Sequence, residues 1–245
     1  PLTILHGNLE LMDERDPEDV EEVRAMLLDE IERMNRLVED LLLLAKSQRP
    51  DFVRPGTVEV SPWLDDTMDR LRALGDRRWE LEARAEGRVL ADAQRLTQAV
   101  LQLAANAVKF SAPGDLVALG AAWATEPAAP GTDVPVRRLE VWVRDTGVGV
   151  APEDQQRIFE RFARAETGRT VEGSGLGLAI VAAIAHGHGG SVGLRSSPGN
   201  GSTFTLRLPG FPPAPAAASG TAGPDPAGPA PAAPGPHATT ASAGK

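Results

Sequence analysis

The chain contains no cysteine. This absence excludes disulfide bridges, thiolate catalysis and zinc sites built on thiolates, and it suits a reducing compartment. No apolar run approaches the roughly 20 residues that a membrane-spanning helix requires, and no signal peptide is visible. The net charge of −9 argues against nucleic acid as a partner and against broad binding to anionic lipid.

Two familiar phosphate-binding motifs are also missing. The glycine-rich run EGSGLGLAIV has Leu178 or Ile180 where the motif G-x-G-x-x-G needs its last glycine. The loop G-x-x-x-x-G-K-[ST] is absent, because the only Gly-Lys pair ends the chain. The length of 245 residues and a hydrophobic content of 42% nevertheless allow more than one folded domain.

Residues 1–48 are predicted to form a helical hairpin. Asp16 can cap a long second helix, and Pro17 can take its first position. A spacing of three and four favours a bundle or coiled coil over one amphipathic helix lying on a domain. The apolar residues with this spacing are Val20, Val23, Leu27, Ile31, Met34, Val38, Leu41 and Ala45.

The first helix of the hairpin is much shorter than the second. It therefore leaves uncovered the far part of the apolar stripe of the second helix, around Met34 to Leu44, and we call this stripe the seam. We expect a second copy of the chain to cover it in a four-helix homodimer. We also expect that the first helix continued upstream of Pro1. Because the chain begins with Pro1 rather than Met, it is interpreted as a fragment or processed product. The missing part could hold a membrane anchor.

Residues 58–209, after a linker at 49–57, are predicted to form an α+β domain with a mixed sheet layered by helices on one face. Alternating patterns predict strands at 57–60, 79–85, 88–92, 116–123, 138–145, 191–197 and 202–209. Helices are predicted at 61–74, from the capping residue Asp92 through Ala107, and at 176–185. The Pro/Ala/Gly-rich tail 210–245 is predicted to be disordered.

Glycine-rich segments at two places indicate a nucleotide site. Bare backbone at Gly173, Gly175 and Gly177 suits a phosphate, because the first N–H groups of a helix lack partners. A hinge or a tight packing turn would explain the same glycines. Asp145 ends a strand before further glycines, where its carboxylate can accept a hydrogen bond from an amine or close an Asx turn.

The segment LAANAVKFS places Asn106, Lys109 and Phe110 on one helix, with the first two on one face. An amide oxygen suits Mg²⁺, an ammonium group suits phosphate and an aromatic ring can flank a purine. The alternative makes Asn106 a cap or a buried amide, Lys109 a solvated side chain and Phe110 part of the core.

In order, LAANAVKFS, RDTGVGV and GSGLGL resemble the N, G1 and G2 boxes of the ATPase domain shared by histidine kinases, gyrase-type topoisomerases, Hsp90-class chaperones and mismatch-repair ATPases. DQQRIFERFAR is similar to the F box of histidine kinases, and GNGSTFTLRLP to the closing strand of the family. PLTILHGNLELM and the long helix after it resemble the dimerisation and phosphoacceptor hairpin. Over residues 1–209, the chain is identified as a member of the sensor histidine kinases, as a catalytic core.

The resemblance implies a two-layer α/β sandwich of the Bergerat type that binds ATP and Mg²⁺. Asp145 would hold the adenine amino group, and Asn106 would coordinate Mg²⁺. The other implied ATP-binding residues are Lys109, Phe110, Gly147, Gly149, Phe159, Phe162, Gly173, Gly175, Leu176, Gly177 and Thr203. Residues 146–172 would be a mobile lid that Phe159 and Phe162 pack down. Gln102 stands where the family often has a further asparagine.

The family motif H-E-x-x-T-P-L begins in this chain at Pro1, so the phosphoacceptor histidine is expected upstream of it. His6 is not expected to replace it, because Gly-Asn-Leu-Glu follows His6. The chain should therefore bind ATP without phosphorylating itself. His188 is interpreted as part of a helix C-cap rather than as half of a metal pair with His186.

The expected activity is transfer of the ATP γ-phosphoryl group to a hairpin histidine and then to an aspartate of a response-regulator receiver domain. The full-length protein is expected to be anchored in the plasma membrane, with this portion in the cytoplasm. Two alternatives are a pseudokinase that acts as a dimerisation platform, and a serine kinase or ATPase on the same fold. Intact N, G1 and G2 boxes argue against the first, and the hairpin and F box argue against the second.

Overall fold

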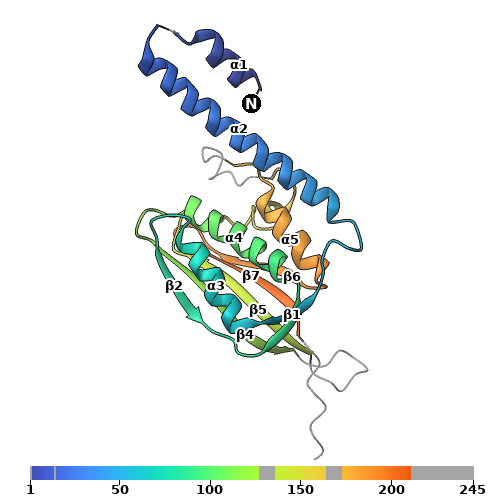
Figure 1. Cartoon of the computed structure of the whole chain (residues 1–245). Helices are drawn as coiled ribbons and strands as arrows, with labels where there is room; N and C mark the ends of the chain where they lie inside the picture. Colours follow the sequence, from blue (N-terminus) through green and yellow to red (C-terminus); the bar gives the residue numbers. More distant parts are fainter. Residues whose placement is uncertain (1, 14, 127–135, 164–172, 211–245) are drawn as a thin grey trace, which may run out of the picture. The chain divides into compact units, whose positions relative to one another are not determined.

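The protein is described by a computed structural model that covers residues 2–13, 15–126, 136–163 and 173–210. Residues 127–135, residues 164–172 of the predicted lid and residues 211–245 of the predicted tail lie outside the described residues. The helices are α1 Leu2–Leu11, α2 Pro17–Lys46, α3 Val60–Arg72, α4 Ala93–Lys109 and α5 Gly177–Gly187, with a short 3₁₀ helix η1 at Arg157–Phe159. The strands are β1 Gly56–Glu59, β2 Arg78–Ala83, β3 Arg88–Ala91, β4 Leu116–Glu126, β5 Val136–Asp145, β6 Ser191–Ser196 and β7 Ser202–Pro209 (Figure 1).

The helical hairpin consists of α1, with 10 residues, and α2, with 30. Asp16 caps α2 as its sequence predicts, because its Oδ1 accepts a hydrogen bond from the Glu18 N–H at 3.0 Å, and Pro17 is the first helical residue. Among the described residues, no helix combines the length and the apolar content that crossing a bilayer would need.

The apolar residues of α2 divide between two surfaces rather than forming one seam. Leu44 is 3% exposed and belongs to the core of the α/β domain, and Leu37 packs against that core. Ile31, Val38 and Leu41 stay about half exposed. The prediction that the seam lacks a cover within the chain is therefore wrong at its carboxyl end, because the α/β domain of the same chain covers Leu44.

The main sheet has five strands in the order β2-β4-β5-β7-β6, with β2 parallel to β4 and the other neighbours antiparallel. A separate antiparallel pair joins β1 to β3. Helices α3, α4 and α5 lie on the same face of the main sheet (Figure 1). The predicted mixed sheet with helices on one face is thus confirmed.

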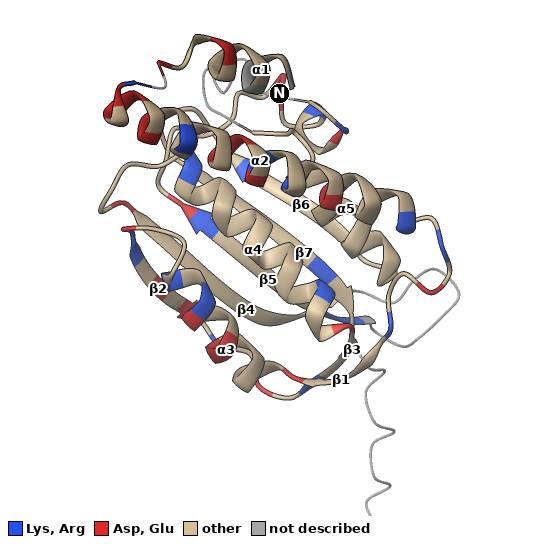
Figure 2. Ribbon diagram, turned by 45° about the horizontal axis from the view of Figure 1, so that its top comes forward, with Lys and Arg blue, Asp and Glu red and all other residues tan. Residues whose placement is uncertain are grey.

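The core lies between these helices and the sheet. Leu103 of α4, Ile180 of α5, Leu139 of β5 and Leu206 of β7 are each at most 1% exposed. Each such side chain stabilises the fold by about 1.5–3 kcal/mol relative to the exposed side chain. Charged residues are interspersed along α2, whereas α5 carries none of the four charged residue types (Figure 2). The apolar helix α5 therefore helps to join the sheet to α2.

The start of the α/β domain differs slightly from the prediction. Strand β1 ends at Glu59, and Val60 begins α3, its N–H donating to the Gly87 carbonyl at 2.9 Å. Pro62 then lies within the first turn, where a missing N–H breaks no helical hydrogen bond. Helix α3 ends at Arg72, so Leu74 lies beyond it and is 37% exposed.

Candidate nucleotide-binding site

Helix α4 carries the first polar cluster of the site. Asp92 caps this helix by accepting a hydrogen bond from the Arg95 N–H at 3.1 Å, and the apolar face of α4 is buried against the sheet. Asn106 and Lys109 are half-buried near the other end. Phe110 is the C-cap residue, and the Lys109 Nζ lies 5.0 Å from the centroid of its ring. The local fold thus brings an amide, an ammonium group and an aromatic ring together.

Asp145, at the end of β5, supplies a buried carboxyl group that is 6% exposed. Its Oδ1 accepts hydrogen bonds from the Gly147 N–H at 2.9 Å and the Ser202 N–H at 3.2 Å. The first of these bonds closes an Asx turn, which is the structural alternative that the sequence left open. Because neither bond uses Oδ2, the Asx turn leaves Oδ2 able to accept a hydrogen bond from a ligand.

Gly147 and Gly149, which follow Asp145, lie so close to backbone atoms of other segments that a side chain would not fit. A Cβ atom on Gly147 would collide with the Phe110 carbonyl oxygen. A Cβ atom on Gly149 would collide with the Ser197 carbonyl oxygen, and Gly149 also has a φ of +72°. The bare backbone here lets β5, α4 and the segment between β6 and β7 meet closely.

The glycines before α5 face the polar side chains of α4. A Cβ atom on Gly173 would collide with the Lys109 Nζ, and one on Gly177 would lie 2.7 Å from the Gln102 Oε1. Leu176, the N-cap residue of α5, provides no side-chain hydrogen bond to the helix. The amino end of α5 therefore lies beside an ammonium group and an amide without a side-chain cap of its own, an arrangement that suits a phosphate.

These segments line one cavity of about 760 Å³, which we call the nucleotide cavity. Its size is within the usual range for pockets that bind small molecules. The α/β domain contributes, among others, Asn106, Lys109, Phe110, Asp145, Gly149, Gly173, Gly175 and Gly177. Helix α2 also lines it, through Arg33, Arg36, Leu37, Glu39, Asp40 and Leu43.

Comparison with known families agrees with this arrangement. Residues 91–211 match the model of the histidine kinase-, DNA gyrase B-, and HSP90-like ATPase, which implies nucleotide binding. Residues 1–50 match the His Kinase A (phospho-acceptor) domain. The chain is also 30% identical to the solved structure of a mycobacterial sensor histidine kinase, MprB, and covers 99% of that structure and 64% of its own length, with a TM-score of 0.52.

The chain belongs to the sensor histidine kinases. Among curated relatives, the sensor-like histidine kinase SenX3 of Mycobacterium tuberculosis is 35% identical in an alignment that covers 79% of this chain and 46% of SenX3. The probable sensor histidine kinase TcrY of Mycobacterium tuberculosis is 37% identical in an alignment that covers 85% of this chain and 43% of TcrY. This kinase core thus spans less than half the length of these relatives.

Two further solved structures are similar to this kinase core. Full-length ShkA, solved in complex with AMPPNP, is 30% identical with a TM-score of 0.60, covering 81% of this chain and 40% of ShkA. ThkA, solved in complex with the response regulator protein TrrA, is 21% identical with a TM-score of 0.64, covering 86% of this chain and 58% of ThkA. The likeness to ThkA supports the fold.

The carboxyl group of Asp145 lies in an environment that changes its pKa. Burial raises the pKa of its carboxyl group above the ordinary value. The N–H groups of Gly147 and Ser202 oppose this effect because they stabilise the charged form, but burial is the larger influence. A ligand that donates a hydrogen bond to a buried carboxylate at this position stabilises its charged form.

Several predicted ATP-binding residues do not line the nucleotide cavity. Thr203 does not, because side chains alternate along β7 and its neighbours Ser202 and Phe204 face the cavity instead. Leu176 is fully buried in the core. Gly147 supports the site from behind through its hydrogen bond to Asp145.

The two phenylalanines of the predicted lid behave differently from each other. The ring of Phe159 meets that of Phe204 edge to face, with centroids 6.2 Å apart. Phe162 is 60% exposed and has a φ of 63°, so its ring does not pack the segment down. Instead, its N–H donates to the Gly175 carbonyl at 3.0 Å, which joins this segment to the glycines before α5.

The residues of α2 in the nucleotide cavity were not predicted. The sequence shows only that Arg33 and Arg36 lie about one turn apart on an amphipathic helix. This arrangement is ordinary for a surface helix, so it does not indicate a binding site. Ser202 and Phe204 could have been identified from the period of β7, once its buried face was known.

Proposed function

We propose that this kinase core binds ATP in the nucleotide cavity and transfers its γ-phosphoryl group to a histidine of the dimerisation hairpin. One observation carries the proposal. A buried carboxylate, an amide, an ammonium group and an uncapped helix amino end converge in one cavity, and a helix of the hairpin lines that cavity.

Each group has a distinct task in this proposal. The Asp145 carboxylate accepts a hydrogen bond from the adenine amino group, and Phe110 lies against the base. Lys109 and the first N–H groups of α5 hold the phosphates. Phosphoryl transfer depends mainly on positioning and charge neutralisation, so a site built from backbone groups and a lysine is sufficient.

The donor set near the phosphates also fits Mg²⁺. This ion is usually bound by one or two protein groups together with phosphates and water, and Asn106 offers an amide oxygen beside Lys109. No group of three His, Cys, Asp or Glu residues that could form a separate metal site occurs in the described part of the chain. When bound, Mg²⁺ would neutralise charge on the phosphates, and Asn106 would hold it there.

We assign the hairpin to residues 1–48, the linker to 49–57 and the ATP-binding domain to 58–209. The hairpin would dimerise through the exposed apolar residues of α2 and pass its phosphoryl group to an aspartate of a response regulator. The complex of ThkA with TrrA supports this choice of partner, and the complex of ShkA with AMPPNP supports the choice of nucleotide.

Calorimetric titration tests the nucleotide site. The wild-type chain should bind ATP with Mg²⁺ and bind GTP much more weakly, because a carboxylate repels the oxygen that guanine has in place of the amino group. Asp145→Asn should weaken ATP binding by about tenfold or more, since a hydrogen bond to a charged group stabilises a complex by about 1.5–3 kcal/mol. Equal affinity for ATP in wild type and variant would contradict the proposed role of Asp145.

Labelling tests the phosphoryl transfer. In the protein encoded by the complete gene, ATP labelled at the γ-phosphate should place an acid-labile label on a hairpin histidine. Asn106→Ala should abolish this label. Labelling of a serine instead would support the alternative of a serine kinase on the same fold.

A further inference from the structure

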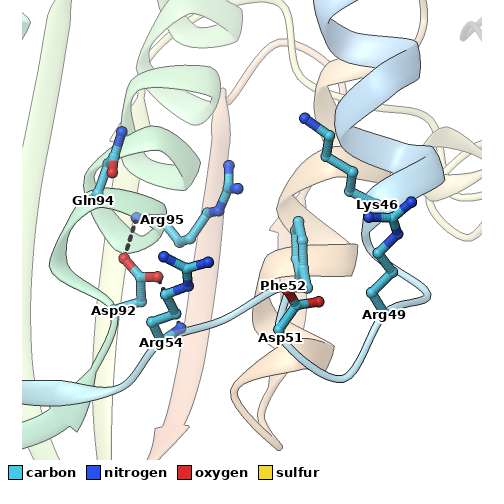
Figure 3. A pocket seen from close by; sticks show the side chains of 8 residues that line it. All are labelled: Lys46, Arg49, Asp51, Phe52, Arg54, Asp92, Gln94 and Arg95. Atoms are coloured by element: carbon cyan, nitrogen blue, oxygen red, sulfur yellow. Dashed lines mark hydrogen bonds between the residues drawn. The ribbon is translucent and has the colours of Figure 1, made fainter.

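A second cavity lies between the carboxyl end of α2 and the amino end of α4, outside the nucleotide site. It has a volume of about 350 Å³, and we call it the α2–α4 cavity. The residues that line it are Lys46, Arg49, Asp51, Phe52, Arg54, Asp92, Gln94 and Arg95 (Figure 3). Four of these eight side chains are cationic and two are anionic, in a chain whose net charge is −9.

Backbone hydrogen bonds hold one side of this cavity in place. The Arg49 N–H donates to the Lys46 carbonyl at 2.9 Å, and the Phe52 N–H donates to the Arg49 carbonyl at 3.1 Å. Such bonds between residues three apart bring their side chains onto one side of the chain. Phe52 is 6% exposed, so it anchors this segment in the core.

The other side of the cavity is held by Arg95 and Asp92. The Arg95 guanidinium lies over the ring of Phe52, 4.8 Å from its centroid, and donates to the Gln98 Oε1 at 2.9 Å. The Asp92 Oδ2 accepts a hydrogen bond from the Arg54 N–H at 3.0 Å. Figure 3 shows the ring of Phe52 between Arg54 and Arg95 on one side and Lys46 and Arg49 on the other.

The charges around the cavity are poorly balanced by the protein itself. In the described part of the chain, Lys46, Arg49, Arg54 and Arg95 make no ion pair. The Asp92 carboxylate uses both oxygens for N–H groups, Oδ1 for that of Arg95 and Oδ2 for that of Arg54. Cationic side chains that line one cavity without an anionic partner repel one another, and a bound anion would reduce this repulsion.

We infer that the α2–α4 cavity binds a small phosphate-type oxyanion. Guanidinium groups match the geometry of phosphate oxygens through paired N–H donors, and three arginines here point to such a ligand rather than to chloride. The one aromatic ring of the cavity is buried and covered by Arg95, so it offers no face for a nucleotide base. A bound oxyanion ties the end of α2 to the start of α4.

Titration with inorganic phosphate, followed by amide NMR at constant ionic strength, tests this inference. The amides of Arg49, Phe52, Arg54 and Arg95 should shift together and saturate. The double variant Arg49→Gln, Arg54→Gln should weaken this binding at least about tenfold, because each lost charged hydrogen bond is worth about that factor. Asp51→Asn should strengthen it, because it removes a carboxylate that repels the ligand.

A matched control separates the site from general charge effects. Arg70→Gln, Arg72→Gln changes the net charge equally on an exposed part of α3, and it should leave the titration unchanged. Shifts confined to residues 173–177 would show that phosphate binds in the nucleotide cavity instead, and would overturn the inference. Equal weakening by the control pair, or wild-type affinity in Arg49→Gln, Arg54→Gln, would also overturn it.

Discussion

The two oxygens of Asp145 have separate tasks. Oδ1 accepts two backbone hydrogen bonds that shape the turn after β5, and in our proposal Oδ2 binds the adenine amino group. This arrangement keeps a carboxylate buried, and burial raises its pKa. If Asp145 binds the ligand as proposed, this residue costs stability in the free protein.

Replacement of Asp145 by Asn should reveal this cost. Because the pKa of the folded state lies above that of the unfolded state, the stability associated with this group is complete below the unfolded-state pKa and is lost as the pH rises through the folded-state pKa. At a pH above both pKa values, Asp145→Asn should thus be more stable than the wild type without ATP. Asn still offers Oδ1 to the two N–H groups.

Denaturant unfolding of both proteins from about pH 8 down to about pH 4 would measure this difference. The advantage of the variant should shrink as the pH falls. A variant that is less stable than the wild type at the upper end, without a change at the lower end, would contradict the assigned cause of the pKa shift.

At the scale of elements, α4 is the helix on which the site depends. The carboxylate of its cap residue, Asp92, accepts hydrogen bonds from the N–H groups of Arg95 and Arg54. The backbone N–H of Asp92 donates to the His188 Nε2 at 2.9 Å. His188 therefore carries its proton on Nδ1, which lies 2.8 Å from the Ile184 carbonyl oxygen. The end of α5 and the start of α4 are joined through one histidine, as a structural cap rather than a metal ligand.

Removal of this cap should destabilise the fold. Asp92→Ala should lower the free energy of unfolding by about 1–2 kcal/mol, because it leaves the two N–H groups without their acceptor. Asp92→Asn should lose less stability, since its amide oxygen still caps the helix at the Arg95 N–H, although its amide nitrogen cannot accept from the Arg54 N–H. Urea unfolding of the two variants beside the wild type would measure both effects, and equal losses would show that charge rather than capping matters.

At the scale of the whole molecule, α2 serves two surfaces at once. Leu37, Leu43 and Leu44 pack against the α/β domain, while Val38 and Leu42 are each 54% exposed. Val38 and Leu42 are one turn apart, so they share a face. This exposed face is the surface that a homodimer would bury.

Charges placed on this face should prevent dimerisation. Val38→Glu, Leu42→Glu is expected to convert a dimer to a monomer in sedimentation equilibrium, because burying four uncompensated carboxylates in a dimer interface is very unfavourable. The control Arg70→Gln, Arg72→Gln changes the net charge of the chain by the same amount and should remain dimeric. A wild-type chain that sediments as a monomer would contradict the proposed homodimer.

Local features were predictable from the sequence. Asp16 and Asp92 were predicted as caps, and both accept the expected hydrogen bonds, because a cap depends on residues two or three positions apart. The strand patterns located the five strands of the main sheet, since alternation records which face is buried. The sequence motifs also singled out Asn106, Lys109 and Asp145, and the structure places all three in the lining of one cavity.

What the sequence by itself determined is therefore local: the caps, the periods of the helices and strands, and the glycine positions. Tertiary structure decided that Phe162 faces solvent, that Thr203 faces away from the cavity and that Leu44 belongs to the core. It also placed Arg49, Arg54 and Arg95 around one cavity. The physical reason is that burial and electrostatic contacts depend on which distant segments pack together, whereas a single stretch of sequence records only its neighbours.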